Sequence, residues 1–407
     1  MSLNQVAQVT PADPVVQPES HSRSLSLAAG LVCVMLIGAA LRPGIVSTGP
    51  LLVSIQEGFR LSHAAASLLT AIPDVLMGLL AAPAPWLAYR FGRDRVILAA
   101  LFLLIAATVA RAFAGASATL FLSTAGVGAG IAVAGALIGG FIKASFSQKA
   151  PFLIGIYTAA LACGSTLAAA VSGPIASLGG SWRFGSGVWA IPGLFAIAAW
   201  VFIETRGRPG ANAAASHYRL PFGEPKAWLI GLFFGANNFL FYSLVAWTAP
   251  LYRERGMDQA SAGLVLASFT ASFIVAPPLA GLFSRRNDRR PLLAGFSALA
   301  LLGMVLLALA PGAAPFLLMP VISFGLAGGF SLGMTLPLDN THNSDEANAW
   351  SAFAILVAYL TAATGPLVVG SLRDLTGGFS VALWVLVGAC VVMLALTPFL
   401  HPRRARP

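Results

Sequence analysis

From Leu25 onward, the sequence alternates long apolar stretches with short polar breaks. Each stretch has the roughly 20 residues that a helix needs to cross the hydrocarbon core of a membrane. Twelve spans are predicted, with approximate limits 26–54, 63–88, 96–114, 118–142, 151–177, 185–203, 227–252, 260–283, 291–310, 315–338, 346–371 and 379–400. The predicted fold class is therefore an all-α integral membrane protein with twelve transmembrane helices.

The composition agrees with this class. Of the 407 residues, 57% are hydrophobic and only 9% are charged, whereas a soluble globular protein carries about 25% charged residues. A surface so poor in charge would not keep the protein dissolved. The formal net charge of +10 does not indicate a nucleic-acid partner, because the Lys and Arg residues lie in short tracts between apolar runs. The expected partner is the lipid bilayer.

The longest break divides the chain near its middle and contains Arg206, Arg208, Pro209 and Gly210. It predicts two six-helix bundles joined by a linker. We expect a disordered cytoplasmic tail at 1–24, an N-terminal bundle at 25–203, a cytoplasmic linker at 204–226, a C-terminal bundle at 227–400 and a basic cytoplasmic tail at 401–407.

Lys and Arg counts predict the orientation. If both termini are cytoplasmic, the segments placed inside hold 17 Lys and Arg residues and those placed outside hold 6. Such a bias is typical of membrane proteins, whose cytoplasmic loops are enriched in positive charge. We therefore expect a multi-pass protein of the plasma (inner) membrane.

The two halves carry related segments. Leu87–Arg95, between spans 2 and 3, resembles Leu282–Arg290, between spans 8 and 9, and Trp189 and Trp384 occupy similar places in spans 6 and 12. Both pairs are 195 positions apart. A parallel duplication of this kind suits alternating access, in which two similar bundles move about a central site.

The segment 87–95 also resembles the signature loop of the major facilitator superfamily. Leu87, Arg90, Gly92 and Arg93 match that pattern, while Tyr89 stands where the family has an aspartate. The resemblance implies the twelve-helix fold of that superfamily and a conformational, gating role for Arg90, Gly92 and Arg93.

Further segments resemble the cyanate transporter-like branch of the superfamily, which includes a nitroimidazole transporter. They are Leu41–Pro43 with Gly49–Leu52, Gly155–Thr158, Trp182–Arg183, Phe241–Tyr242 with Trp247, and Gly365–Pro366 through Arg373–Gly377. This resemblance implies a transporter for a small solute, either a small anion or a small planar molecule.

Arg42 is a charged residue deep in a span. It lies about fifteen residues into span 1, or ~22 Å along a helix, and a charge at the centre of a span costs at least ~2.5–3.5 kcal/mol. Its planar guanidinium suits an anion, so Arg42 is predicted to bind substrate. The alternative is a structural salt bridge. Pro43 should interrupt the helix locally.

Asp74 lies at a similar depth in span 2. Three roles stay open: it neutralises Arg42 in the empty carrier, it takes up a proton and couples transport to the proton gradient, or it forms a hydrogen bond to a neighbouring helix. A buried carboxylate needs one of these arrangements because burial disfavours its charge.

Polar and aromatic residues in other spans complete the predicted substrate site. Span 7 supplies Asn237, Asn238, Tyr242 and Trp247, of which Asn238, Tyr242 and, less well, Trp247 could share a helix face. Interhelical hydrogen bonding is the alternative for this cluster. Tyr157 in span 5 and Tyr359 in span 11 occupy similar places in the two halves and could cap a substrate, with simple packing as the alternative.

Three arginines fall near the predicted outer ends of spans, namely Arg111, Arg183 and Arg373. They could draw anions toward the mouth of the transporter. Anchoring at the membrane interface is the favoured interpretation.

The favoured function is a secondary active transporter that moves a small anion, such as cyanate or a small carboxylate or oxyanion, with protons as a candidate coupling ion. The alternative within transport is export of small neutral or planar compounds by proton antiport. A membrane-embedded enzyme or receptor is the distant alternative, because the five histidines lie in tails or breaks. We expect no enzymatic activity, no catalytic or metal site, no cofactor and a monomeric carrier.

Overall fold

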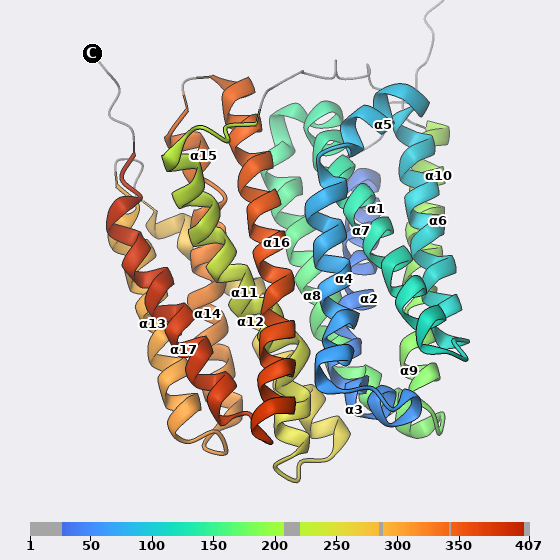
Figure 1. Ribbon diagram of the computed structural model, residues 1–407. Coiled ribbons are helices and arrows are strands. Elements are labelled where there is room, and N and C mark those ends of the chain that lie inside the picture. The colour runs from blue at the N-terminus through green and yellow to red at the C-terminus, as the bar shows by residue number, and fades with distance from the viewer. Residues whose placement is uncertain (1–26, 207–219, 285–287, 342, 403–407) are drawn as a thin grey trace, which may run out of the picture.

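The computed structural model describes residues 27–206, 220–284, 288–341 and 343–402. These residues form helices and, among them, no strands. Twelve of the helical segments are long and apolar enough to cross a membrane, and they are arranged side by side (Figure 1). The predicted tail at 1–24, most of the linker at 204–226 and residues 403–407 of the C-terminal tail lie outside the described residues.

The first half holds six spans. The helices are α1 (Leu27–Leu41), α2 (Pro43–Val46), α3 (Thr48–Phe59), α4 (His63–Ala81), α5 (Ala84–Phe91), α6 (Arg93–Ala112), α7 (Ser117–Ser145), α8 (Ala150–Leu178), α9 (Trp182–Gly187) and α10 (Ala190–Arg206). A short 3-10 helix, η1 (Ser147–Lys149), precedes α8. Together α1, α2 and α3 make the first span, and α9 and α10 make the sixth.

The second half holds the other six spans. Its helices are α11 (Pro225–Arg253), α12 (Gln259–Phe283), α13 (Arg290–Leu309), α14 (Pro315–Gly333), α15 (Leu336–Asp339), α16 (Ser344–Thr376), α17 (Ser380–Leu396) and the 3-10 helix η2 (Thr397–Phe399). The predicted spans 63–88 and 315–338 each end earlier than expected, with a short separate helix, α5 or α15, after the span.

Several helices begin at side chains that bond their free backbone N–H groups. The Ser62 hydroxyl accepts from the Ala65 N–H at 3.1 Å at the start of α4, and the Asp258 carboxylate accepts from the N–H groups of Ala260 and Ser261 at the start of α12. The first N–H groups of a helix have no partner within it, so these caps fix where the spans begin.

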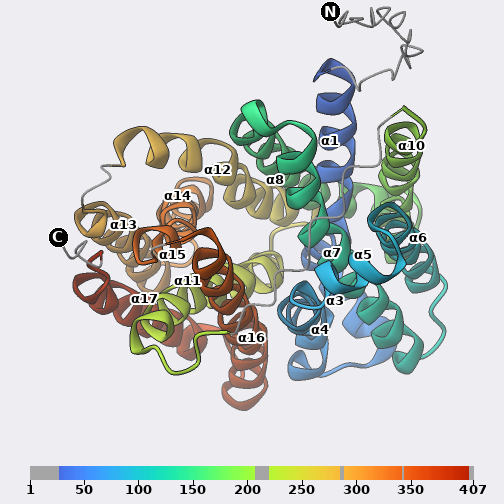
Figure 2. The same ribbon diagram turned by 90° about the horizontal axis from the view of Figure 1, so that it is seen from above.

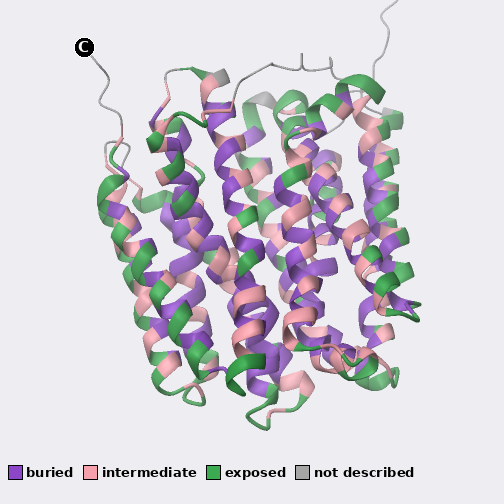
Figure 3. Cartoon of the chain, in the orientation of Figure 1, coloured by how far each residue is buried: buried purple, intermediate pink, exposed green. Residues whose placement is uncertain are grey.

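Exposed and buried residues alternate along the helices of the bundle (Figure 3), and many of the exposed residues are large and apolar. The exposed ones include Phe102, Leu122, Leu194, Leu264, Leu302 and Val392. A water-soluble protein keeps such exposed large apolar side chains few. These side chains are suited to lipid, which fits the twelve apolar spans.

The two halves lie side by side when the molecule is viewed along its helices (Figure 2). The contacts between them run along α4 against α16 and α8 against α12. A Cβ atom at Gly370 on α16 would lie 2.5 Å from the His63 carbonyl oxygen on α4. The Ser67 hydroxyl of α4 donates to the Pro366 carbonyl of α16 at 2.7 Å. The halves are therefore closely packed near the start of α4.

A carboxylate of the second half caps a helix of the first half at the lower face in Figure 1, where α4 begins and α16 ends. The Asp374 carboxylate accepts from the N–H groups of His63 at 3.0 Å and Ala64 at 2.8 Å. The His63 ring Nδ1 lies 2.6 Å from the same carboxylate. Nearby, Arg373 donates to Glu254 at 2.9 Å. We call the contact of Asp374 with His63 and Ala64 the cross-half cap.

The cross-half cap should restrain the start of α4. Replacing Asp374 with Asn removes the negative charge that faces the helix N-terminus. We expect amide hydrogen exchange in the first turn of α4 to become about two- to fivefold faster, since a negative charge at a helix N-terminus is worth about 0.3–1 kcal/mol. Mass spectrometry of the exchanged protein checks this.

The matched control is Asp258→Asn, because Asp258 caps α12 from within its own half. This change should speed exchange at the start of α12 and leave α4 as it was. Unchanged exchange at α4 in Asp374→Asn would show that the charge of the cross-half cap does not restrain the start of α4.

Candidate functional site

Arg42 lies at the break in the first span, as the position of Pro43 predicts. Helix α1 ends at Leu41, and the Arg42 carbonyl accepts from the N–H groups of Ile45 and Val46 as the short helix α2 begins. Proline has no N–H to donate and clashes with the preceding turn. The predicted span is therefore three helices rather than one, with breaks at Arg42 and Ser47. The Arg42 side chain projects from the first of these breaks.

The Arg42 guanidinium contacts the other half of the protein. Its Nη1 donates to the Tyr242 hydroxyl on α11 at 2.5 Å, and the guanidinium lies within electrostatic range of Tyr359 on α16. The rings of these two tyrosines are 6.1 Å apart. Arg42 is partly buried, whereas Tyr242 is fully buried. A group able to bind an anion thus bridges the two halves near the middle of the first span.

A third tyrosine, Tyr157 on α8, also lies within electrostatic range of Arg42 and Tyr359. Two glycines lie close to it: a Cβ at Gly135 would lie 3.8 Å from the Tyr157 hydroxyl, and one at Gly38 would lie 3.1 Å from its ring. The structure therefore brings together four of the predicted substrate-binding residues. We call Arg42, Tyr157, Tyr242 and Tyr359 the arginine–tyrosine cluster.

Asp74 lies on α4 within electrostatic range of Arg42 and Tyr242. Its side chain is fully buried, and neither carboxylate oxygen has a hydrogen-bond partner among the described residues. The ion pairs of at most 4.0 Å within the described part of the chain do not include one between Asp74 and Arg42. The predicted coupling role of Asp74 stays a prediction.

Asn237 and Asn238 bond to backbone carbonyls. The Asn237 amide donates to the Leu326 carbonyl of α14 at 2.9 Å, and the Asn238 amide donates to Phe234 within α11 at 2.8 Å. Both are buried. These contacts match the interhelical and local bonding that we gave as the alternative to substrate binding, and neither asparagine contacts Arg42 through a hydrogen bond described here.

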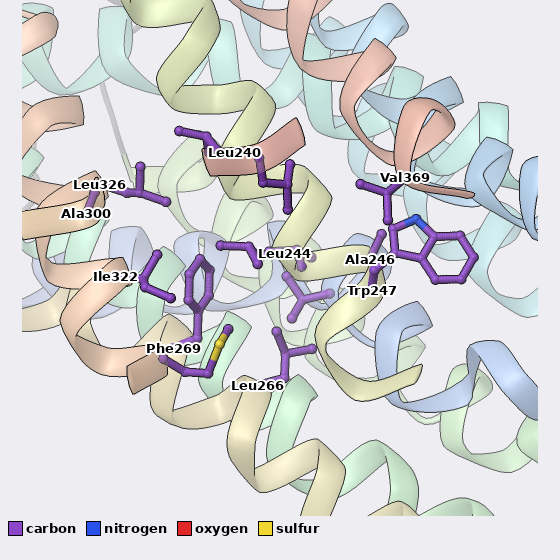
Figure 4. Close-up of a cluster of buried hydrophobic side chains, with 14 of the residues drawn as sticks. Leu240, Leu244, Ala246, Trp247, Leu266, Phe269, Ala300, Ile322, Leu326 and Val369 are labelled. Atoms are coloured by element: carbon purple, nitrogen blue, oxygen red, sulfur yellow. The ribbon is translucent and has the colours of Figure 1, made fainter. Parts of the chain in front are cut away.

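Trp247 also lies apart from the arginine–tyrosine cluster. Its indole N–H donates to the Pro366 carbonyl at 3.0 Å, and its ring lies 5.6 Å from that of His63. Figure 4 shows the ring beside Val369 of α16. Trp247 therefore packs where the two halves meet near the cross-half cap.

The loop between α5 and α6 places Arg90, Gly92 and Arg93 at the other face. Gly92 has φ +88°, which suits glycine, and it ends α5 and precedes α6. Arg93 lies over the Phe141 ring of α7 at 5.2 Å, whereas Arg90 is exposed. The gating role of these three residues stays a prediction.

In the first copy of this loop Arg93 pairs with Asp94 at 3.4 Å, whereas the second copy forms an ion pair with a residue outside the loop. Arg289 Nε lies 2.6 Å from an oxygen of Asp339, the last residue of α15. Burial raises the pKa of the Asp339 carboxyl, and the neighbouring Arg289 opposes that shift. Asp339 is therefore tied to a loop rather than to the arginine–tyrosine cluster.

One buried arginine was not expected from the sequence. Arg111 lies near the end of α6, where we predicted an anchor at the interface, but it is 1% exposed. Its Nη1 donates to the Gly44 carbonyl of α2 at 2.7 Å, and its Nε donates to Ser186 at 3.0 Å. The position of Arg111 at a span end gave no signal of this burial. Arg183 instead stacks on Trp182 and bonds to the Ala114 carbonyl.

Comparison with known proteins shows which family this chain resembles. Residues 27–365 match the model of the Major Facilitator Superfamily. The chain is 32% identical over 372 residues to the "Cyanate transport protein CynX" of Escherichia coli (strain K12), covering 90% of this chain and 95% of that protein. It is 29% identical over 376 residues to the "2-nitroimidazole transporter" of the same organism, covering 90% and 93%.

The fold also matches solved structures. A bacterial homologue of the human lysosomal transporter Spinster, in an inward-facing and occupied conformation, superposes with a TM-score of 0.77 at 18% identity, covering 92% of this chain and 96% of that one. At this identity the likeness concerns the fold alone. With twelve apolar spans, two packed halves and a family match over most of its length, the chain belongs to the major facilitator superfamily and is a membrane transporter of that family.

Proposed function

We propose that the protein is a secondary active transporter that carries a small anion by alternating access, with Arg42 as the anion-binding residue. One observation carries the proposal. The Arg42 guanidinium bridges the two halves through Tyr242 and has no carboxylate within ion-pair distance in the described part of the chain. A buried cation whose partners are neutral hydroxyls keeps its charge available to an anion.

The location of the cluster supports alternating access. Its four residues come from both halves, Arg42 and Tyr157 from the first and Tyr242 and Tyr359 from the second. A solute bound there would contact both bundles. Movement of one bundle against the other would then change access to the solute while it stays bound.

The relatives support a small substrate. Their names describe transport of cyanate, a small anion, and of 2-nitroimidazole, a small planar molecule. Cyanate or a small carboxylate or oxyanion would fit the donors of Arg42 and the three tyrosine hydroxyls.

The distribution of Lys and Arg further supports a plasma-membrane location with both termini in the cytoplasm, and we expect a monomer.

A second candidate is export of small neutral or planar compounds in exchange for protons. Asp74 favours it, because a buried carboxyl without a hydrogen bond can hold a proton in one state and release it in another. The candidates differ in what binds at Arg42.

Uptake into proteoliposomes tests the anion-binding role of Arg42. The panel contains cyanate, formate and nitrite, with neutral 2-nitroimidazole for comparison. Arg42→Ala should reduce uptake of the accepted anion by about 30-fold or more, since removing one member of a buried charged contact costs 2–5 kcal/mol. Tyr242→Phe, which keeps the ring and removes the hydroxyl, should have a smaller effect.

The control for this experiment is Arg183→Ala. Arg183 stacks on Trp182 at 4.6 Å and bonds to a carbonyl of its own half, so its loss should leave the choice among solutes unchanged. Normal uptake of the anion by Arg42→Ala would remove the anion-binding hypothesis. Preference of the parent protein for 2-nitroimidazole would support the second candidate.

Asp74→Asn tests proton coupling in the same vesicles, with and without a pH gradient. If Asp74 carries the coupled proton, accumulation driven by the gradient should be lost while exchange of labelled for unlabelled solute continues. Asn has nearly the same shape but does not titrate. Asp258→Asn, an exposed helix cap, is the control. Accumulation at the parent level in Asp74→Asn would exclude the coupling role.

A further inference from the structure

Arg111 is buried in the first half, close to the chain segment that carries Arg42. It comes from α6 and reaches two other helices, donating to the Gly44 carbonyl of α2 at 2.7 Å and to the Ser186 hydroxyl of α9 at 3.0 Å. Gly44 is two residues after Arg42. The contact therefore joins the body of the first half to the interrupted part of the first span.

The bond from Arg111 to Gly44 matters because the first span is interrupted at this point. Helix α2 covers only residues 43–46, and α3 begins at Thr48 after Ser47. A four-residue helix has few backbone bonds of its own, and unpaired carbonyls are costly away from water. The carbonyls here take bonds from side chains: Gly44 from Arg111 at 2.7 Å and Ile45 from the Thr48 hydroxyl at 2.5 Å.

Close packing holds α2 from another side. A Cβ atom at Gly44 would lie 2.8 Å from the Val127 side chain of α7 and 3.7 Å from Leu104 of α6. The segment thus fits against α6 and α7 while Arg111 bonds its carbonyl. Sliding or rotation of α2 would break the bond from Arg111 to the Gly44 carbonyl. The contact therefore fixes the direction in which the Arg42 side chain projects from the backbone.

Arg111 differs from Arg42 because it bonds only within its own half. It is 1% exposed, and both of its hydrogen-bond acceptors are protein oxygens of the first half. Its Nη2 has no hydrogen-bond partner among the described residues. A guanidinium has five N–H donors in a fixed plane, which lets one side chain bond a carbonyl and a hydroxyl at once.

We propose that Arg111 is a positioning residue for substrate binding: by bonding the Gly44 carbonyl it holds the interrupted segment so that Arg42 reaches Tyr242 and the anion. This inference rests on the proposed role of Arg42. Arg111 acts through the backbone and does not touch the substrate.

The first measurement is amide hydrogen exchange across residues 44–48 in the purified full-length protein. Arg111→Gln should speed exchange there by about tenfold, the loss expected when a hydrogen bond from a charged group is removed. Arg111→Lys, which keeps a charged donor, should show a smaller increase. Arg183→Gln is the matched control, because Arg183 bonds to a carbonyl outside this segment. Arg111→Met, which has a long side chain without hydrogen-bond donors, serves if Arg111→Gln does not fold.

The second measurement is cyanate uptake into proteoliposomes. Arg111→Gln should raise the apparent KM by about tenfold with a much smaller change in maximal rate, and Arg111→Lys should restore part of the loss. In an Arg42→Lys background, whose binding group is already altered, the same Arg111 change should have less effect on KM. A purely structural role would lower the amount of active protein without this dependence.

The outcomes are distinguishable. Unchanged exchange at 44–48 in Arg111→Gln, or in Arg111→Met if the first variant does not fold, would overturn the inference, as would faster exchange with an unchanged KM. A parent protein that transports no anion of the panel would refute the proposed function. The exchange measurement would then still decide whether Arg111 holds the interrupted segment.

Discussion

The contact between Arg42 and Tyr242 joins the two halves of the protein by a charge near the middle of the first span. A charge in that position is costly, so the surrounding structure must compensate for it. It does so with tyrosine hydroxyls, which are neutral, rather than with a carboxylate at ion-pair distance among the described residues. The cluster is consequently polar but retains its positive charge. A transporter for an anion requires that combination, because a firmly paired arginine would have to give up its partner each time a substrate binds.

The packing between the halves explains how such a site can lie in a protein that must also move. Small residues such as Gly370 allow α4 and α16 to lie in close contact, while the Asp374 carboxylate caps α4 at one face. This contact is made of a few exposed polar groups, which separate at lower cost than a buried apolar interface. At the other face, the corresponding loops contact their own halves, through Arg93 over Phe141 and Arg289 with Asp339.

Much of this fold could be predicted from the sequence because the membrane restricts the possible structures. Apolar length predicted the twelve spans, and the Arg42–Pro43 pair predicted a break that the structure contains. The cluster was predicted in part. Arg42, Tyr157, Tyr242 and Tyr359 come together, whereas Asn237 and Trp247 bond to carbonyls of neighbouring helices. In a span that is apolar on all sides, periodicity does not indicate which face meets a neighbour. Arg111 was missed for a related reason. Its position near the end of a span does not reveal that the Gly44 carbonyl of the interrupted first span accepts a hydrogen bond from it.

The most direct test of the account is a crystal structure of the protein with a heavy-atom form of the anion that it accumulates, selenocyanate for cyanate or bromoacetate for a carboxylate. Anomalous scattering locates the heavy atom without assumptions about the site. The account predicts a peak among Arg42, Tyr157, Tyr242 and Tyr359, with the anion in hydrogen-bond contact with the Arg42 guanidinium. An ordered peak elsewhere between the two halves, with Arg42 still bonded only to its tyrosines, would contradict it.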